Sequence, residues 1–391
     1  MTIPVKKIST FCKTGSGGTP SRSNNAFFEN GTIPWVKSGE LKNRYITEIE
    51  EYITDLAVEK SSAKLVSKGS LLIAMYGATV GEVSQLTFDA TTNQAICNIQ
   101  PDENVCDVNY LYRFLEASKP YLLSRRVGGG QPNISQSVIK DLDVPLPPLS
   151  EQRRIASILD QADELRQKRQ QAIEKLDQLL QATFIDMFGD PEKNPKKWNK
   201  VVLGDICDQK DRVNYGVVQP GNEFEGGVPL IRVGDIDGGI LSFHLIKRID
   251  PEIEKDYSRS RIKGNEVLVS CVGSIGTIAK VPNEAIGFNI ARAITRVPLQ
   301  DKRIINFVAE CLKTEAIQNY FKKNTRTVSQ PTLNVSFVKE TEIIFPNEEK
   351  ILDFCKIVDK VEFQKELLQK ALVMQESLFQ SLQNQAFNGT L

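Results

Sequence analysis

Two long segments of the chain carry apolar residues at alternating spacings of three and four. They cover residues 150–184 and 347–386, and both are poor in glycine and proline. Apolar heptads sustained over this length predict a coiled coil. Because each segment has one apolar stripe and no other obvious partner, the two are expected to pair. The seam is expected to include Ile158, Leu165, Leu176, Leu179, Val358, Val361, Leu368 and Leu372.

The ends of the first segment carry clear signals. Pro147 and Pro148 cannot lie inside a helix, Ser150 can cap its start, and Gly189 and Pro191 can end it. Further apolar residues widen this stripe, so a second surface is expected to pack there: Leu159, Ile173, Leu180 and Phe184. The alternative is two amphipathic helices that each lie on their own domain.

The remaining stretches are rich in glycine, serine, threonine, valine and isoleucine, which is typical of mixed strands and helices. The expected fold class is α+β, with two mixed α/β domains separated by two long helices that form an antiparallel coiled coil. The expected boundaries are 1–149 for the first domain, 150–188 for the first helix, 189–200 for a linker, 201–346 for the second domain and 347–391 for the second helix.

Matching motifs indicate that the chain is a tandem duplication. The segment 33–41 parallels 228–236 and Lys68-Gly69 parallels Lys263-Gly264, both 195 positions apart, while Gln131-Pro132 parallels Gln330-Pro331 at 199. In the helical segments, Arg169 and Lys365 interrupt the seam 196 positions apart. The repeating unit is therefore about 195 residues, a domain followed by a helix.

An antiparallel helix pair would separate two such domains. The seam from 155 to 183 spans roughly 43 Å at ~1.5 Å per residue. That length corresponds to about 13 base pairs of duplex DNA at ~3.4 Å per pair. If both domains contacted one duplex, their contacts would lie about one helical turn of DNA, or slightly more, apart.

Composition narrows the function classes. The 391 residues contain 49 basic and 49 acidic side chains, so any basic surface must be local. Seven scattered cysteines and one histidine predict no disulfide framework and no metal site, and they fit a reducing cytoplasm. No apolar run is long enough to predict a membrane span.

No catalytic residue is predicted. The sequence has no P-loop, no dinucleotide fingerprint and no amino-methyltransferase motif. The carboxylate–lysine clusters that begin at Asp190 and Asp250 lie beside prolines and are interpreted as solvated loops. His244 is interpreted as a packed or surface strand residue, and Cys271 as a core residue.

Two basic stretches recur at corresponding places in this neutral chain. Residues 119–140 and 313–339 each carry a net charge of +4 around a Gln-Pro turn. Arginine and lysine bind phosphates and guanine edges, and glutamine and asparagine can bind adenine. We therefore predict DNA contacts near these turns. The candidates are Lys37, Ser38, Tyr76, Thr79, Arg125, Arg126, Gln131, Asn133, Arg232, Ser270, Ser274, Lys322, Arg326, Gln330 and Asn334.

Several motifs resemble the specificity (S) subunit of type I restriction–modification systems. They are SGGTPS at 16–21, IPWVKSG at 33–39, PLPPLSEQRRI at 145–155 and FIDMFGDP at 184–191. The resemblance spans essentially the whole chain. It implies a cytoplasmic, non-catalytic subunit whose two target-recognition domains each read half of a bipartite double-stranded DNA site.

The resemblance also implies partners. Two methyltransferase (M) subunits would use S-adenosylmethionine to methylate adenine, and two restriction (R) subunits would use ATP and Mg. No cofactor is expected in this chain and no membrane is involved. Charged residues off the seam are expected to bind the M subunits: Arg153, Arg154, Glu164, Arg166 and Lys168. The alternatives are a type IIG-like system with a fused nuclease–methylase partner, and a coiled-coil scaffold without DNA binding.

Overall fold

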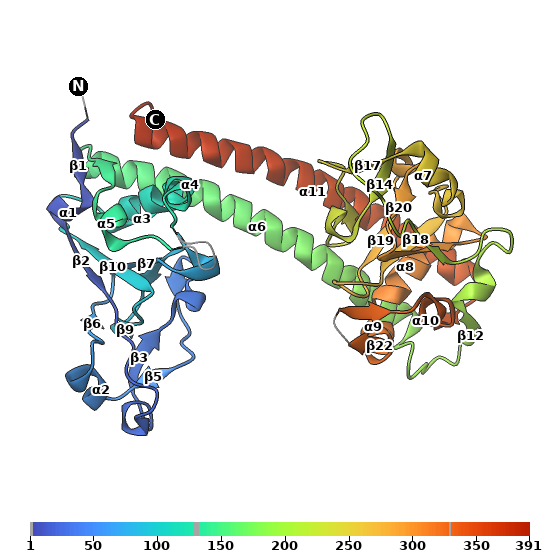
Figure 1. Cartoon of the computed structure of the whole chain (residues 1–391), viewed down its shortest axis with the longest axis horizontal. Helices are drawn as coiled ribbons and strands as arrows, with labels where there is room; N and C mark the ends of the chain where they lie inside the picture. Colours follow the sequence, from blue (N-terminus) through green and yellow to red (C-terminus); the bar gives the residue numbers. More distant parts are fainter. Residues whose placement is uncertain (1–2, 128–132, 328–329) are drawn as a thin grey trace. The chain divides into compact units, whose positions relative to one another are not determined.

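The computed structural model describes residues 3–127, 133–327 and 330–391. Its contacts divide the chain into two compact units. The first unit comprises Met1–Arg169 and Ala371–Leu391, and the second comprises Gln170–Lys370. Each unit therefore contains one strand-rich domain and a segment of each of the two long helices (Figure 1).

The first unit is built on two sheets, and one strand of the larger sheet, β7, packs against two apolar clusters. The larger sheet has the order β2-β10-β7-β8-β4 and the smaller has the order β5-β3-β9-β6. Along β7, alternate residues face different cores, because strand side chains alternate between faces. Leu71 and Ile73 pack in one apolar cluster, and Leu72 and Ala74 in the other. The strands are β2 (Cys12–Ser16), β3 (Ile33–Val36), β4 (Tyr45–Ile46), β5 (Tyr52–Ile53), β6 (Leu65–Val66), β7 (Leu71–Ala74), β8 (Val83–Leu86), β9 (Ala90–Thr92) and β10 (Ile96–Pro101).

Short helices and one further strand pair complete this domain. The helix that packs against β8 and the long helices is α3, and Asp107 caps its start by accepting hydrogen bonds from the backbone N–H groups of Asn109 and Tyr110. The elements are β1 (Val5–Lys7), α1 (Ile8–Phe11), α2 (Asp55–Lys60), α3 (Val108–Ala117), α4 (Lys119–Ser124), α5 (Gln136–Lys140) and β11 (Asp143–Pro145), with β1 and β11 antiparallel.

The second unit repeats this topology. Its sheets have the orders β13-β21-β18-β19 and β17-β14-β20, which match the order of the corresponding strands in the first unit. The duplicated strand order agrees with the predicted tandem repeat. The strands are β12 (Asn199–Val202), β13 (Asn214–Tyr215), β14 (Val228–Ile231), β15 (Ile236–Asp237), β16 (Ile240–Leu241), β17 (Lys247–Ile249), β18 (Glu266–Ser270), β19 (Ile278–Lys280), β20 (Asn289–Ile290), β21 (Ile294–Pro298), β22 (Thr325–Thr327), β23 (Pro331–Leu333) and β24 (Glu342–Phe345).

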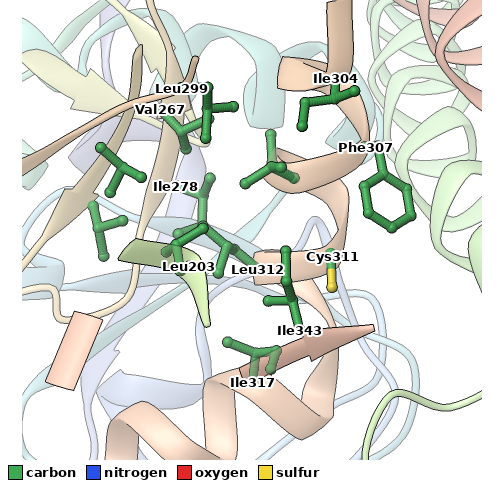
Figure 2. Close-up of a cluster of buried hydrophobic side chains, with 14 of the residues drawn as sticks. Leu203, Val267, Ile278, Leu299, Ile304, Phe307, Cys311, Leu312, Ile317 and Ile343 are labelled. Atoms are coloured by element: carbon green, nitrogen blue, oxygen red, sulfur yellow. The ribbon is translucent and has the colours of Figure 1, made fainter. Parts of the chain in front are cut away.

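The core of the second unit forms where a helix covers its larger sheet. Figure 2 shows Leu312 of α8 near Ile278 of the sheet, with Val267 of the sheet and Phe307 of α8 further apart in the same cluster. All four side chains are almost completely buried in one cluster. The helices of this domain are α7 (Pro251–Lys255), α8 (Ile305–Lys313), α9 (Glu315–Lys323) and α10 (Val335–Lys339).

Two long helices, α6 (Leu149–Phe188) and α11 (Glu348–Asn388), contribute to both units. Within the first unit, Arg154 contacts the backbone of Leu391 and Arg166 lies over Phe379. Within the second, Lys365 pairs with Asp177, and Phe184 packs on Phe354 with ring centroids 5.5 Å apart. In each unit, residues later in α6 meet residues earlier in α11, so the two segments run antiparallel. The expected fold class is confirmed.

The predicted seam of α6 is wrong at two positions. Leu165 and Leu179 are 57% and 51% exposed, whereas Leu180 is 2% exposed. The buried stripe is shifted because α6 packs against its own domains as well as against α11, which brings Leu159 and Ile173 to the inside. The remaining predicted seam positions are buried or half-buried: Ile158, Leu176, Val358, Val361, Leu368 and Leu372.

The offset between the two helices also differs from the prediction. Ile155 corresponds in burial to Phe354, and Leu159 to Val358, each pair 199 positions apart. The predicted offset of 196 came from matching polar interruptions, which recur every turn or two of a heptad pattern and so fit several registers. The offset of 199 equals that of the two Gln-Pro turns.

Candidate nucleic-acid interface

In the first unit, a glycine turn after β7 joins the basic segment. Gly77 has φ +76°, a left-handed conformation that glycine adopts without strain. Its neighbour Tyr76 is 42% exposed and forms an isolated β-bridge with Asn133. Asn133 also pairs with Val127, through N–H to carbonyl bonds of 2.9 and 3.0 Å. The structure therefore brings Tyr76 and Asn133 together beside Val127, the residue that follows the two arginines at 125 and 126.

The second unit places the same parts in the same order. Gly273, with φ +78°, follows Val272, which bridges to Thr332. Thr332 pairs with Arg326 in the antiparallel β22–β23 hairpin. Lys322 of α9 and Thr325 of the hairpin line, with the Gly273 turn, a cavity of about 410 Å³. Two predicted sites of one kind thus recur at corresponding positions in the two domains.

The cations of these two surfaces differ in how they are held. Arg125 and Arg126 are exposed, with the Arg125 guanidinium 5.0 Å from the Tyr121 ring centroid and Arg126 Nε donating to the Leu123 carbonyl. Lys322 and Arg326 are exposed as well. Lys119 instead pairs with Glu82 at 2.6 Å, which removes one of the charges counted in the first basic stretch.

The second stretch loses a charge in the same way, because Lys313 pairs with the buried Glu310 at 2.6 Å. Of the amide candidates, Gln330 is exposed, and Asn334 is also exposed and caps α10 by accepting a hydrogen bond from the Ser336 N–H. Gln131 lies outside the described residues.

Two predicted DNA contacts are engaged by carboxylates. Lys37 Nζ lies 2.8 Å from Glu50 and 3.0 Å from Glu51, and these hydrogen bonds raise the pKa of Lys37. Arg232 donates from Nε and Nη2 to Asp235 at 3.0 and 2.9 Å, which raises the pKa of its guanidinium. Their charges are compensated locally, so both residues position loops rather than present free positive charge.

The four serine and threonine candidates divide by exposure. Ser38 and Thr79 are half-buried in short 3₁₀ turns, and Ser274 is exposed in the turn after β18. Ser270 is completely buried, and its hydroxyl donates to the Ser274 carbonyl. A fully buried hydroxyl cannot reach a base edge, so the prediction of direct DNA contact is wrong for Ser270.

The predicted partner-binding residues lie on α6 and differ in their ion pairs and exposure. Arg154 pairs with Glu151 at 2.6 Å, and Arg166 pairs with Asp163 at 2.7 Å. Glu164 and Lys168 pair with each other at 2.6 Å, and both side chains stay more than 60% exposed. Arg153 is 67% exposed and lies 3.5 Å from Asp107.

A buried ionic anchor, which the sequence did not reveal, fixes α3 to α6 in the first unit. Arg113 is 1% exposed and donates to Asp160 at 2.7 Å, Glu116 at 2.9 Å and Asp163 at 3.1 Å. Arg44 adds a second bond to Asp160 at 2.7 Å. The acids at 160 and 163 lie one helical turn apart, but their partner arginines are distant in sequence, so only the fold reveals the cluster.

Other chemistry is sparse in the part of the chain that the structure describes. Among residues 3–127, 133–327 and 330–391, no group of three or more histidine, cysteine or acidic side chains is arranged to hold a metal ion. No helix there is long and apolar enough to cross a membrane. Cys271 is 3% exposed, which confirms its place in the core, whereas His244 lies in an exposed turn rather than in a strand.

The two units define a tandem-duplicated α/β protein in which each domain is followed by a long helix. A family model described as the type I restriction modification DNA specificity domain matches residues 2–175 and again residues 195–372. The chain belongs to this family, whose specificity subunits it resembles in both halves.

Curated relatives and solved structures agree with this assignment. The chain is 28% identical over 330 residues to the type I restriction enzyme EcoBI specificity subunit of Escherichia coli, covering 77% of this chain and 69% of the relative. It is 27% identical over 382 residues to the MjaIX specificity subunit of Methanocaldococcus jannaschii, covering 90% and 85%. The S subunit from M. genitalium has the same fold, with a TM-score of 0.55 at 18% identity and coverage of 99% and 96%.

Proposed function

We propose that this chain is the DNA-recognition subunit of a type I restriction–modification enzyme, and that each domain reads one half of a bipartite site. The observation that carries the proposal is the recurrence of one arrangement: a left-handed glycine turn bridged to a basic segment, at Gly77 and again at Gly273. The chain as a whole carries no net charge, so the two corresponding local excesses of exposed cations support binding of a polyanion such as DNA at these surfaces.

The side chains divide by the chemistry they offer. Arg126 and Arg326 are proposed to contact guanine edges or phosphates, and Asn133 and Gln330 to contact adenine edges. Arg125 and Lys322 are proposed to bind phosphates and so to fix the register. The remaining exposed or half-buried candidates line the turns: Ser38, Tyr76, Thr79, Ser274 and Asn334.

The two long helices are proposed to set the distance between the half-sites. Each helix belongs to both units, since α6 begins in the first and ends in the second, while α11 does the reverse. A continuous helix of 40 residues is about 60 Å long at ~1.5 Å per residue. A change of helix length is therefore expected to change the spacing that the protein reads.

Catalysis is proposed to belong to other polypeptides. In this account two M subunits supply S-adenosylmethionine-dependent adenine methylation, and two R subunits supply ATP- and Mg-dependent cleavage. Arg153, Glu164 and Lys168 are exposed along α6 and are proposed to contact the M subunits directly. Arg154 and Arg166 are held by acids of their own helix and are proposed to shape that surface.

The test uses the complex with M subunits and a labelled duplex that carries the site mapped from methylated adenines in the host genome. Arg126→Ala and Arg326→Ala should each weaken specific binding by ~1–3 kcal/mol. An arginine that binds a phosphate should also reduce the salt slope by about one. Lys356→Ala is the matched control, because Lys356 is exposed on α11 and pairs with Asp353. Unchanged affinity and salt slope in both arginine variants would refute the proposed interface.

A further inference from the structure

The turn between β16 and β17 in the second unit exposes a leucine in an unfavourable backbone conformation. Leu245 is 82% exposed, the highest value among the large hydrophobic side chains in the described residues. Its φ is +58°, in the left-handed region that L residues with a Cβ rarely adopt. An exposed leucine with a strained backbone does not stabilise the fold, so stability does not explain why Leu245 occupies this position.

The corresponding turn of the first unit provides an internal comparison. Strand pairing places Pro34 opposite Tyr52 and Pro229 opposite Arg248, so the segment of the second unit is one residue longer. In the first unit this turn carries carboxylates, with Glu50 bound to Lys37. Each turn already packs one isoleucine on its core, Ile49 and Ile246. Leu245 is thus an additional apolar residue in a place where the first unit is acidic.

The side chain of Arg232 holds this turn in position. Arg232 Nη2 lies 3.4 Å from the Leu245 carbonyl oxygen, and the same guanidinium is fixed by Asp235 through two bonds. Because Arg232 is anchored in this way, the turn keeps its conformation despite the strain. This contact also gives Arg232 a role other than the DNA contact predicted for it.

The surroundings of Leu245 are cationic. Residues 243–248 contain two cations, one histidine and no acid. Lys247 Nζ donates to the Gly221 carbonyl, and Arg248 Nη1 donates to the Gly227 carbonyl at 2.9 Å. Neither side chain forms an ion pair with a carboxylate of the described residues, and Glu223 accepts from the backbone N–H of Arg248 rather than from its guanidinium. An apolar tip followed by two cations without carboxylate partners matches a thymine methyl group in the major groove and the flanking phosphates.

We propose that Leu245 is a specificity-determining residue of the second domain, which places its side chain against base edges in a groove of the second half-site while Lys247 and Arg248 bind the flanking phosphates. This inference rests on the proposed DNA-recognition function and adds to it a residue outside the two basic segments. The first unit, with an acidic turn at the corresponding place, reads its half-site without such a contact.

The test compares Leu245→Gly with wild type in the complex with M subunits. Glycine removes the side chain and relieves the left-handed strain, so the melting temperature should be unchanged or higher. Affinity for the labelled duplex of the mapped site should fall about tenfold, as expected for losing part of a leucine's burial. The salt slope should not change, because no phosphate contact is lost. Lys247→Ala should lower the slope instead.

The matched control is Asn30→Gly, since Asn30 is an exposed non-glycine residue with φ +57° in the first unit. It should leave DNA affinity unchanged. Wild-type affinity in Leu245→Gly would overturn the inference, and so would loss of M-subunit co-purification with unaltered DNA binding, which would make the turn a protein contact. If Leu245→Gly binds normally while Arg326→Ala does not, the inference fails and the proposed function stands. If the wild-type complex does not bind the mapped site, the proposed function itself fails.

Discussion

Replacing Arg113 by methionine should selectively destabilise the first unit. Arg113 is 1% exposed and its guanidinium binds three carboxylates, at 160, 163 and 116, within 3.1 Å. Burial lowers the pKa of Arg113, but the surrounding acids outweigh burial and raise it, so the side chain stays charged. Methionine fills similar space and leaves Asp163, which is 5% exposed, with only one of its two arginine partners.

The size of the effect follows from the buried acids that lose an arginine partner. Removing one partner of a buried ion pair costs about 3–5 kcal/mol. Here Arg166 still binds Asp163 and Arg44 still binds Asp160, so the lower end, about 3 kcal/mol, is expected. For a unit of this size, the corresponding fall in melting temperature is roughly 6–12 °C.

The two tryptophans allow the units to be followed separately. Trp35 lies in the first unit, is 2% exposed and donates from Nε1 to the Gly18 carbonyl at 3.0 Å. Trp198 lies in the second and donates to the Phe188 carbonyl at 2.9 Å. Urea unfolding followed by fluorescence in a Trp198→Phe background reports the first unit, and a Trp35→Phe background reports the second.

Arg113→Met should shift only the Trp35 transition. Adding Asp163→Leu should recover part of the loss, because the double variant no longer buries an unpaired charge. The reasoning would be refuted by a loss below 1 kcal/mol, by an equal shift of the Trp198 transition, or by a double variant less stable than the sum of its single changes.

Three further predictions concern the second unit, the turns and the helices. Burial raises the pKa of Asp211, but hydrogen bonds from Arg296 and Lys263 outweigh it and hold the folded pKa below its ordinary value. The stability of the second unit should therefore fall as pH drops below about 4, and Asp211→Asn should weaken that pH dependence in Trp198-monitored unfolding. Gly77→Ala should lower both DNA affinity and stability, the latter by ~1 kcal/mol, because alanine is strained at the left-handed φ of this position. Gly39→Ala should change neither quantity, because Gly39 has open space around it and no left-handed φ. Inserting seven residues into both α6 and α11 should lengthen the methylated site's spacer, and an unchanged spacer in genome-wide methylation maps would contradict the role proposed for the helices.

Long-range periodicity was the part of the fold that the sequence predicted best. Heptad spacing identified both long helices, and repeated glycine motifs identified the duplication, because each signal is set by local geometry. The positions Leu165 and Leu179 show the limit of that reasoning. A helix that packs on a domain and on another helix has a wide apolar stripe, and heptad spacing alone does not say which residues in it face inward.

The candidate site was only partly predictable for a related reason. The turns and basic segments are visible in the sequence, but whether a cation is free depends on residues that are distant along the chain. Lys119 is paired with Glu82, and Lys37 with Glu51, which removes their charge from the surface. Burial of Ser270 likewise depends on how the strands stack. The sequence does not reveal Leu245, because only comparison of the two folded turns shows that it is an additional exposed residue.

Methylation mapping with Arg126→Ala and Arg326→Ala complexes tests the central claim most directly, because it reads each half of the site separately. If each domain reads one half, Arg126→Ala should relax the sequence at one end of the methylated site and Arg326→Ala at the other, with the spacer unchanged in both. Relaxation of both ends by either variant, or a single uninterrupted site in the wild type, would contradict the account.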